Sequence, residues 1–96
     1  MKPTVIVALL LSLASACQAQ QRFSWPGGTR AAVSLSYDDA LPSQLDHALP
    51  ALNTHGLRAT FYLTLASETV TQRLAEWRQA AAQGHELGNH TVHHPC

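Results

Sequence analysis

The sequence predicts an α/β domain in which three strands alternate with two helices, in the order β-α-β-α-β. Two kinds of apolar pattern indicate this order. Short stretches that alternate or are rich in β-branched and aromatic residues are typical of strands. Between them lie two longer stretches in which apolar residues recur every three or four positions, as in amphipathic helices. Strands that alternate with helices imply a parallel sheet with right-handed crossovers.

The first strand is expected over residues 31–37, where apolar residues alternate with small ones, and it leads directly into Asp38 and Asp39. A helix follows Pro42, with Ser43 as its cap and Asp46 as the partner of that cap. One face of this helix carries Leu45, Ala48, Leu49 and Leu52.

Pro50 interrupts the first helical pattern and should kink or restart the helix, and Gly56 should end it. Residues 59–64 read as the second strand. The second helix is predicted from apolar residues at helical spacing, which are Val70, Leu74, Trp77 and Ala81. Gly84 should end that helix, and residues 85–90 read as a short third strand.

In parallel α/β folds, working residues gather at the carboxyl ends of the strands. Asp38 and Asp39 end the first predicted strand, and a histidine-rich stretch ends the third. His90 and His94 are four residues apart, so both rings could reach one ion, and His93 competes with His94 because a spacing of three also works. We therefore expect an acidic pair and an imidazole pair to meet at one rim.

Two imidazoles and one carboxylate with open positions suit Zn²⁺ in a hydrolase, or Fe²⁺ and its relatives. Asp38 or Asp39 could be the ligand, and the other could remain ionised as a general base. An iron-dependent oxygenase would use the same ligand types, but the β-α-β order and the early position of the aspartates speak against it.

Each of these features also has a plainer interpretation. Adjacent aspartates often cap a helix, and two histidines four apart are often exposed polar residues. His47 and His55 are expected at the surface, and His85 is expected to bond local backbone. Trp77 fits a core position better than a ligand platform. The rim interpretation is preferred because one topological assumption explains both signals.

Composition excludes some classes of function. The 96 residues include 6 Lys+Arg and 6 Asp+Glu, so no basic surplus exists for binding nucleic acid. Charged residues make up 12% of the chain, against a usual share of about 25%, which argues against a disordered segment.

Residues 1–19 have the layout of a secretory signal peptide, so we expect an exported protein, periplasmic or extracellular. Cys17 stands near the cleavage point, where it could carry a lipid that attaches the chain to a membrane; cleavage after residue 16 or 19 without lipid is equally compatible. Residues 20–30 read as a linker. No disulfide framework follows from Cys17 and Cys96, and the oligomeric state is not indicated.

Two motifs and their surroundings resemble the NodB-type polysaccharide deacetylases, carbohydrate esterase family 4. Residues 36–40, S-Y-D-D-A, resemble the family motif T-F-D-D-G, and residues 90–95, H-T-V-H-H-P, resemble H-[S/T]-x-x-H-P. The stretches 59–62 and 84–89 also look like the family between these motifs. The resemblance covers residues 31–96.

The resemblance implies a partial (β/α) barrel and a divalent metal, most commonly zinc. Asp39, His90 and His94 would be the metal ligands, and Asp38 would be the general base. The substrate would be an N-acetylated glycan, chitin-like or peptidoglycan-like, which releases acetate. Hydrolysis of another linear C–N bond, or non-catalytic binding of metal or glycan, stays open as an alternative.

The chain departs from the family pattern in two ways. Ala40 replaces a glycine, which matters if that position needs a positive φ. The later family motifs, which supply groove residues and a general acid, are not in these 96 residues, and a (β/α) barrel needs about 200 residues or more. We therefore expect the N-terminal part of a deacetylase domain that is marginally stable and inactive alone.

Overall fold

A computed structural model describes residues 23–95. The predicted signal peptide over residues 1–19, with Cys17, and the terminal Cys96 lie outside the described residues, so these interpretations stay predictions. The chain divides into two compact units, Met1–Ala32 and Val33–Cys96. No helix within the described range combines the length and apolar character that a membrane crossing requires.

The described part of the first unit is short. It contains one 3₁₀ turn, η2 (Pro26–Gly28), in which Gly27 has a φ of 68°. The rings of Phe23 and Trp25 meet edge to face, with centroids 4.7 Å apart. The linker predicted for residues 20–30 is not tested by these features.

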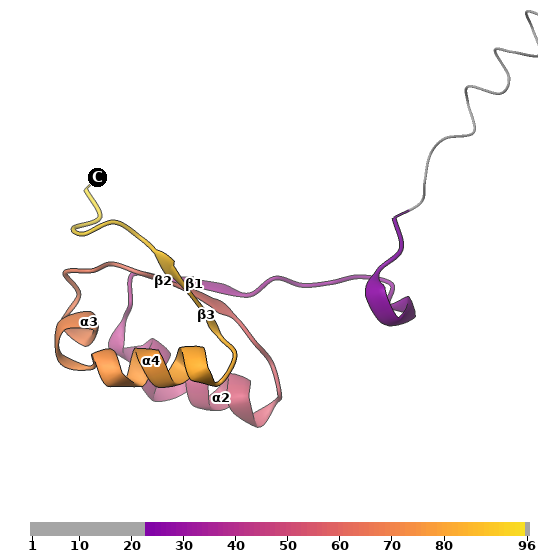
Figure 1. The fold of residues 1–96 in the computed structure, drawn as a ribbon, viewed down its shortest axis with the longest axis horizontal. Coiled ribbons are helices and arrows are strands. Elements are labelled where there is room, and N and C mark those ends of the chain that lie inside the picture. Colours follow the sequence, from indigo (N-terminus) through magenta and orange to yellow (C-terminus); the bar gives the residue numbers. More distant parts are fainter. Residues whose placement is uncertain (1–22, 96) are drawn as a thin grey trace, which may run out of the picture. The chain divides into compact units, whose positions relative to one another are not determined.

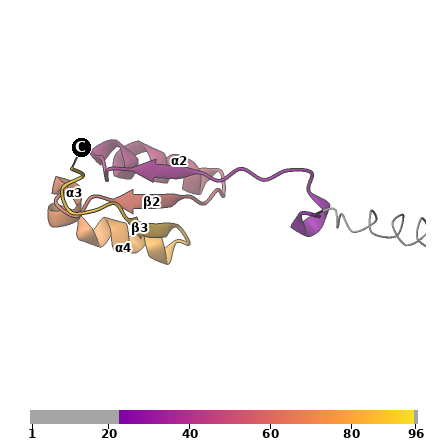
Figure 2. The same ribbon diagram turned by 90° about the horizontal axis from the view of Figure 1, so that it is seen from above.

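The second unit contains a parallel three-stranded sheet in the order β1-β2-β3. Its strands are β1 (Ser36–Asp38), β2 (Thr60–Leu63) and β3 (Glu86–Asn89). Both strand pairs are parallel, and Phe61 of β2 lies opposite Tyr37 and Leu87. Figure 2 shows the strands side by side with β2 in the middle. The predicted α/β class and the β-α-β-α-β order are confirmed; a barrel is not shown by these three strands.

The first strand is shorter than the predicted range 31–37. It begins at Ser36, although the carbonyl of Leu35 still accepts a hydrogen bond from the Thr60 amide (3.0 Å). Val33, which the alternating pattern included, is 83% exposed. Alternation makes a segment suitable for a strand, but a strand also needs a hydrogen-bonding neighbour. β2 is only four residues long, so it can pair with only a few residues of the first strand.

All the helices of this unit lie on one side of the sheet (Figure 1). The first crossover consists of a π-helical segment, η3 (Gln44–Ala48), that continues into α2 (Leu49–Thr54). The second crossover consists of α3 (Glu68–Gln72) and α4 (Leu74–Ala82). The right-handed crossover rule explains why both cover the same face, since β1, β2 and β3 follow one another in space.

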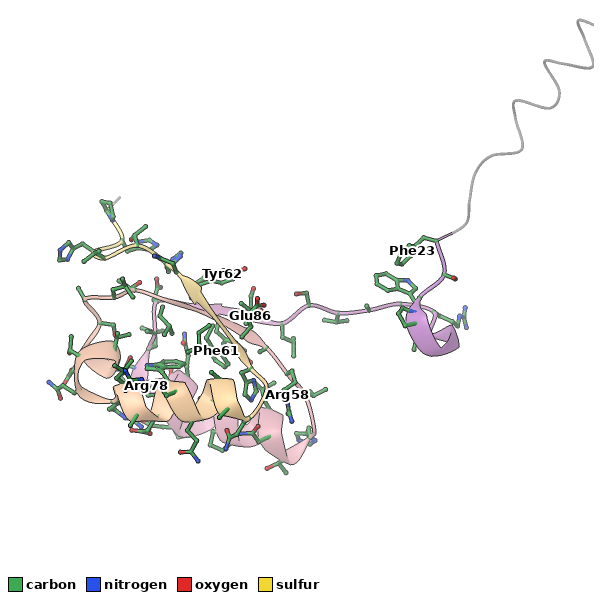
Figure 3. All side chains as sticks on the ribbon, in the orientation of Figure 1. Phe23, Arg58, Phe61, Tyr62, Arg78 and Glu86 are labelled. Carbon is green, nitrogen blue, oxygen red and sulfur yellow. The ribbon has the colours of Figure 1, made fainter. Side chains whose placement is uncertain are left out.

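The core lies between this sheet face and the helices. Phe61 and Trp77 are fully buried, and the Phe61 ring has Tyr37 at 5.0 Å and Trp77 at 5.5 Å between centroids. Figure 3 shows Phe61 on the helix side of the sheet and Tyr62 and Glu86 on the other side. This alternation follows from the two-residue period of a strand. The core position expected for Trp77 is confirmed.

The first helix differs from its prediction at its start. Ser43 already has helical dihedrals and makes no side-chain cap bond. Asp46 is not its partner but accepts a hydrogen bond from Arg73 (2.7 Å), which also binds Glu76. The Arg73 guanidinium lowers the pKa of both carboxyls, and they raise its own pKa. The capping prediction was therefore wrong, because the Asp46 carboxylate bonds Arg73, 27 residues along the chain, and not the start of its own helix.

Pro50, where the sequence predicted a kink or a restart, marks the change from the π-helical segment η3 to α2. It lies in the first turn of α2, where its missing N–H is not required. Just before it, the Leu49 amide bonds the Gln44 carbonyl, which is the wider π-type turn. Gly56 ends the helix with a φ of 64°, as predicted.

The second helix is broken where the pattern predicted continuity. Arg73 has φ −123° and ψ 28°, so α3 and α4 are separate. The break changes the phase of α4, and Leu74 is 40% exposed while Ala80 is buried. The prediction that Leu74 and Ala81 share the buried face with Trp77 was therefore wrong.

His85 is buried directly before β3, and its partners are distant in sequence rather than local. Its Nδ1 accepts the Ala59 N–H (3.3 Å), and its Nε2 lies 3.0 Å from Asn53 Oδ1. A neutral ring that carries its proton on Nε2 satisfies both contacts. Burial lowers the pKa of His85, and the nearby Arg58 cation lowers it further. By contrast, His47 and the other helix-end histidine, His55, are exposed, as predicted.

We expect the stability of the chain to fall as the pH decreases below about 6.5. His85 has a lower pKa folded than unfolded, so on acidification the unfolded chain binds a proton that the folded chain resists. The limiting slope for one group is about 1.4 kcal/mol per pH unit. Urea unfolding between pH 5.5 and 7.5 measures it. His85→Gln should reduce the slope, whereas His47→Gln, at an exposed site, should leave it unchanged; equal slopes in both variants would contradict the assignment.

Candidate metal centre

The first part of the site is a tight turn directly after β1. Asp39 and Ala40 both have left-handed backbones, with φ values of 76° and 54°. The sequence comparison with the T-F-D-D-G motif singled out the fifth residue as needing glycine if φ were positive, and Ala40 does have a positive φ. The turn changes the chain direction at once, which brings the Asp39 carboxylate to the carboxyl end of the sheet.

The second part is the loop after β3, which is fixed against the turn after β2 by backbone hydrogen bonds. The His90 amide bonds the Leu63 carbonyl at 3.0 Å. The amides of Leu65 and Ala66 then bond the carbonyls of Thr91 and Val92, at 3.0 and 2.9 Å. The parallel pairing therefore continues past the ends of both strands, and it holds the histidine loop over the same rim as Asp39.

The histidine loop is also fastened internally. Asn89 Oδ1 accepts the Thr91 N–H at 2.7 Å, and Thr91 Oγ1 accepts the His94 N–H at 2.9 Å. Thr91 and His94 have φ values of 66° and 47°. The loop is thus a turn rather than a helical start, and left-handed residues bring His94 back toward His90.

Asp39, His90 and His94 meet at this rim. Asp39 Oδ1 lies 3.4 Å from His90 Nε2 and 3.8 Å from His94 Nε2. One ligand atom from each of the three residues lies within 4.8 Å of the others. The two imidazole rings are 4.6 Å apart between centroids. The convergence predicted from the strand order is present, although the roles of these side chains stay predictions.

The arrangement fits a divalent cation. Ligand atoms about 2.0–2.2 Å from Zn²⁺ in tetrahedral geometry lie about 3.3–3.6 Å from each other, close to the 3.4 and 3.8 Å that separate Asp39 Oδ1 from His90 Nε2 and His94 Nε2. The side chains are 27% (His90), 49% (Asp39) and 51% (His94) exposed, so one side of the cluster faces solvent. Three protein ligands with one open side are typical of a catalytic rather than a structural metal site.

Asp38 is adjacent to the cluster in sequence but is not one of its members. It is the last residue of β1 and alternates with the partly buried Tyr37, which places Asp38 on the sheet face away from the helices. Its register partner on that face is Tyr62. The main chain of Asp38 is fixed from the helix side, because Gln44 Nε2 donates a hydrogen bond to its carbonyl.

An open pocket of about 440 Å³ adjoins the cluster. Asp39 and His94 form part of its wall, together with His93, which is exposed and does not join the three-residue group. The rest of the lining comes from the turn after β2: Thr64, Ala66 and Ser67. Sequence reasoning did not select these residues, although their position directly after the second strand could have indicated them.

A sequence model of the family described as polysaccharide deacetylase matches residues 26–96. This match covers most of the chain and includes both motifs. The chain belongs to the polysaccharide deacetylase family. No curated protein and no solved structure matched the chain. The resemblance inferred from the two motifs is confirmed, and membership of a polysaccharide deacetylase family indicates a hydrolase that removes acetyl groups from polysaccharides.

Proposed function

We propose that this polysaccharide deacetylase chain carries the metal-binding half of a metal-dependent amide hydrolase that removes N-acetyl groups from a chitin-like or peptidoglycan-like glycan. The observation that carries the proposal is the cluster of Asp39, His90 and His94, whose ligand atoms lie within 4.8 Å of one another. Two imidazoles and one carboxylate on an open rim are a donor set suited to Zn²⁺.

Asp39, His90 and His94 would hold the cation. When bound, Zn²⁺ supplies a Lewis acid that polarises the amide carbonyl and makes water acidic enough to attack near neutral pH. The protein contributes fixed ligand positions, and the backbone bonds from Leu63 and Leu65 to the histidine loop support this role. Zinc is preferred because the proposed reaction is a hydrolysis without a redox step.

Asp38 would act as the general base. Its carboxylate would accept a proton from the attacking water while a new C–O bond forms at the acetyl carbon. The C–N bond then breaks, acetate leaves, and the amine nitrogen takes up a proton. Asp38 suits this task because it directly precedes Asp39 at the end of β1 but is not in the ligand cluster, so it stays available to the water.

The glycan would lie along the open pocket beside the cluster. The Thr64 hydroxyl and the His93 ring offer hydrogen bonds for sugar hydroxyls, the Ser67 oxygen can accept one, and Ala66 offers an apolar contact. We further infer that the 96-residue chain alone does not turn over substrate. In the described part of the chain β1 and β3 each pair on one side only, and a (β/α) barrel requires about 200 residues or more.

The test combines a Zn²⁺ titration with an assay on an N-acetylglucosamine oligomer. We expect the full chain to bind one Zn²⁺, and the Zn²⁺-loaded chain to bind the acetylated oligomer better than its deacetylated glucosamine counterpart. Asp38→Asn should leave Zn²⁺ affinity unchanged, because Asp38 is not a ligand.

Three outcomes separate the parts of this proposal. No Zn²⁺ binding would contradict the metal site. Equal binding of both oligomers would contradict the N-acetyl substrate. Acetate release by the chain alone would contradict only the inference of inactivity, and its loss in Asp38→Asn would then support the role of the base.

A further inference from the structure

The turn that carries Asp39 is held by side chains from both crossovers. The Ala40 carbonyl accepts hydrogen bonds from Thr69 Oγ1 at 2.6 Å and from Ser67 Oγ at 3.0 Å. Both donors come from the start of α3, almost 30 residues along the chain. Ala40 is fully buried, so these hydroxyls replace the water that its carbonyl would otherwise bind.

The Thr69 bond has a defined direction. Trp77 Nε1 donates to Thr69 Oγ1 at 3.2 Å, and indole N–H is only a donor. Thr69 is 1% exposed, and its single hydroxyl proton is used toward Ala40. The buried chain of bonds therefore runs from Trp77 through Thr69 to the Ala40 carbonyl, and it connects the core of the domain to the residue that follows Asp39.

Neither hydroxyl serves the helix on which it lies. Ser67 occupies the N-cap position of α3 but makes no side-chain cap bond there. Serine at this position usually bonds an amide of the first helical turn. Its hydroxyl reaches the Ala40 carbonyl instead, so local helix capping is replaced by support of the turn.

A third donor holds the other side of Asp39. Gln44 Nε2 bonds the Asp38 carbonyl, and Gln44 is 5% exposed. Within the described residues its Oε1 atom is buried without a hydrogen-bond partner. Burying an unsatisfied amide oxygen costs about 1–3 kcal/mol. The fold bears this cost at Gln44 Oε1 while the Nε2 atom of the same side chain holds the Asp38 carbonyl.

We propose that Thr69, assisted by Ser67, is a positioning residue for the Asp39 ligand; this inference rests on the proposed metal site. A left-handed conformation costs a non-glycine residue roughly 1–2 kcal/mol, and Asp39 and Ala40 adopt it in succession. Bonds to the Ala40 carbonyl offset this cost. Without them the turn relaxes toward negative φ, and the carboxylate moves away from His90 and His94.

The experiment compares the unchanged full chain with three variants: Thr69→Val, Thr69→Ser and Thr71→Val. Thr69→Val keeps the shape but removes the hydroxyl, and Thr69→Ser restores it. Thr71→Val is the matched control, because within residues 23–95 the Thr71 hydroxyl bonds only its own helical turn, at the Ser67 and Glu68 carbonyls. Zn²⁺ affinity is measured by competition with a chromophoric chelator.

Thr69→Val should weaken Zn²⁺ binding by about 10–100-fold, the range known for groups that orient metal ligands. Thr69→Ser and Thr71→Val should bind as the unchanged chain does. A folded Thr69→Val chain with unchanged Zn²⁺ affinity would overturn the proposal, since a purely structural role alters the unfolding midpoint alone. If Thr69→Val does not fold, Ser67→Ala removes the second donor without opening the core and should weaken binding to a smaller extent.

A metal-free measurement separates this inference from the proposed function. A strong intraresidue NOE between amide and α protons marks a positive φ. We expect it at Asp39 and Ala40 in the unchanged chain and in Thr69→Ser, and we expect it to weaken in Thr69→Val. If the unchanged chain binds no Zn²⁺ but shows this dependence, the metal site fails and the support of the turn stands. If the NOE is the same in all three chains, the positioning role fails.

Discussion

Replacing Asp39, His90 or His94 by alanine is expected to lower the affinity of the chain for Zn²⁺ by more than about 100-fold. Groups that merely orient a ligand account for losses of about 10–100-fold, and loss of a ligand should exceed that range. The three residues contribute the atoms that lie within 4.8 Å of one another, so each removal leaves only two donors. Zn²⁺ competition titration of each variant measures the loss.

His93→Ala is the matched control for this prediction. His93 has the same side chain as its neighbour His94 and lines the same pocket, but it does not join the cluster. Its removal should leave Zn²⁺ affinity within the error of the measurement. If His93→Ala weakened Zn²⁺ binding as much as His94→Ala, the assignment of the ligands would be wrong. If all four variants bound Zn²⁺ as tightly as the unchanged chain, a metal site at this rim would be contradicted.

The three ligand mutations should not unfold the chain. Their side chains are 27% to 51% exposed and lie outside the core, so truncating them removes little buried area. Replacing Asp39 or His94 by alanine keeps a Cβ, so the substitution does not remove the backbone strain of a positive φ at that position. Far-UV circular dichroism of the metal-free variants should match the unchanged chain, which separates loss of binding from loss of fold.

Much of the rim could be predicted because strand order alone determines it. The motif residues follow two strands that a parallel sheet must present at the same edge, and the alternating and helical periods were sufficient to find those strands. Their meeting required no knowledge of side-chain contacts. The lengths of the elements were predicted less well, because the start of β1 depends on how far β2 extends beside it.

The conformation of the rim could not be predicted in the same way. The positive φ of Asp39, Thr91 and His94 violates local preference. Local bonds to Asn89 and Thr91 fasten the histidine loop, but the Asp39 turn is held by bonds from distant residues. The bond from Thr69 to the Ala40 carbonyl spans 29 residues, and no spacing rule encodes it. Sequence reasoning failed at Asp46 for the same reason, since Arg73 bonds it across a comparable separation.

Trp77→Ala is expected to destabilise the chain by about 3–5 kcal/mol, the usual cost of truncating a buried tryptophan. Trp77 is fully buried against Phe61, and its indole N–H is the first donor in the chain of bonds that ends at Ala40. Small domains are marginally stable, so a loss of this size should leave the variant largely unfolded at 25 °C.

Urea unfolding followed by circular dichroism tests this expectation against two comparison variants, Arg78→Ala and Trp77→Phe. Arg78→Ala alters the adjacent, exposed residue and should change stability by no more than about 0.5 kcal/mol. Trp77→Phe keeps an aromatic ring but is smaller and lacks the N–H, so its stability should fall between those of the other two variants. It should also weaken Zn²⁺ binding, because Thr69 loses the donor that orients its hydroxyl. A Trp77→Ala chain as stable as Arg78→Ala would mean that the helices do not pack on the sheet through Trp77, and the support of the Asp39 turn would then have no anchor in the core.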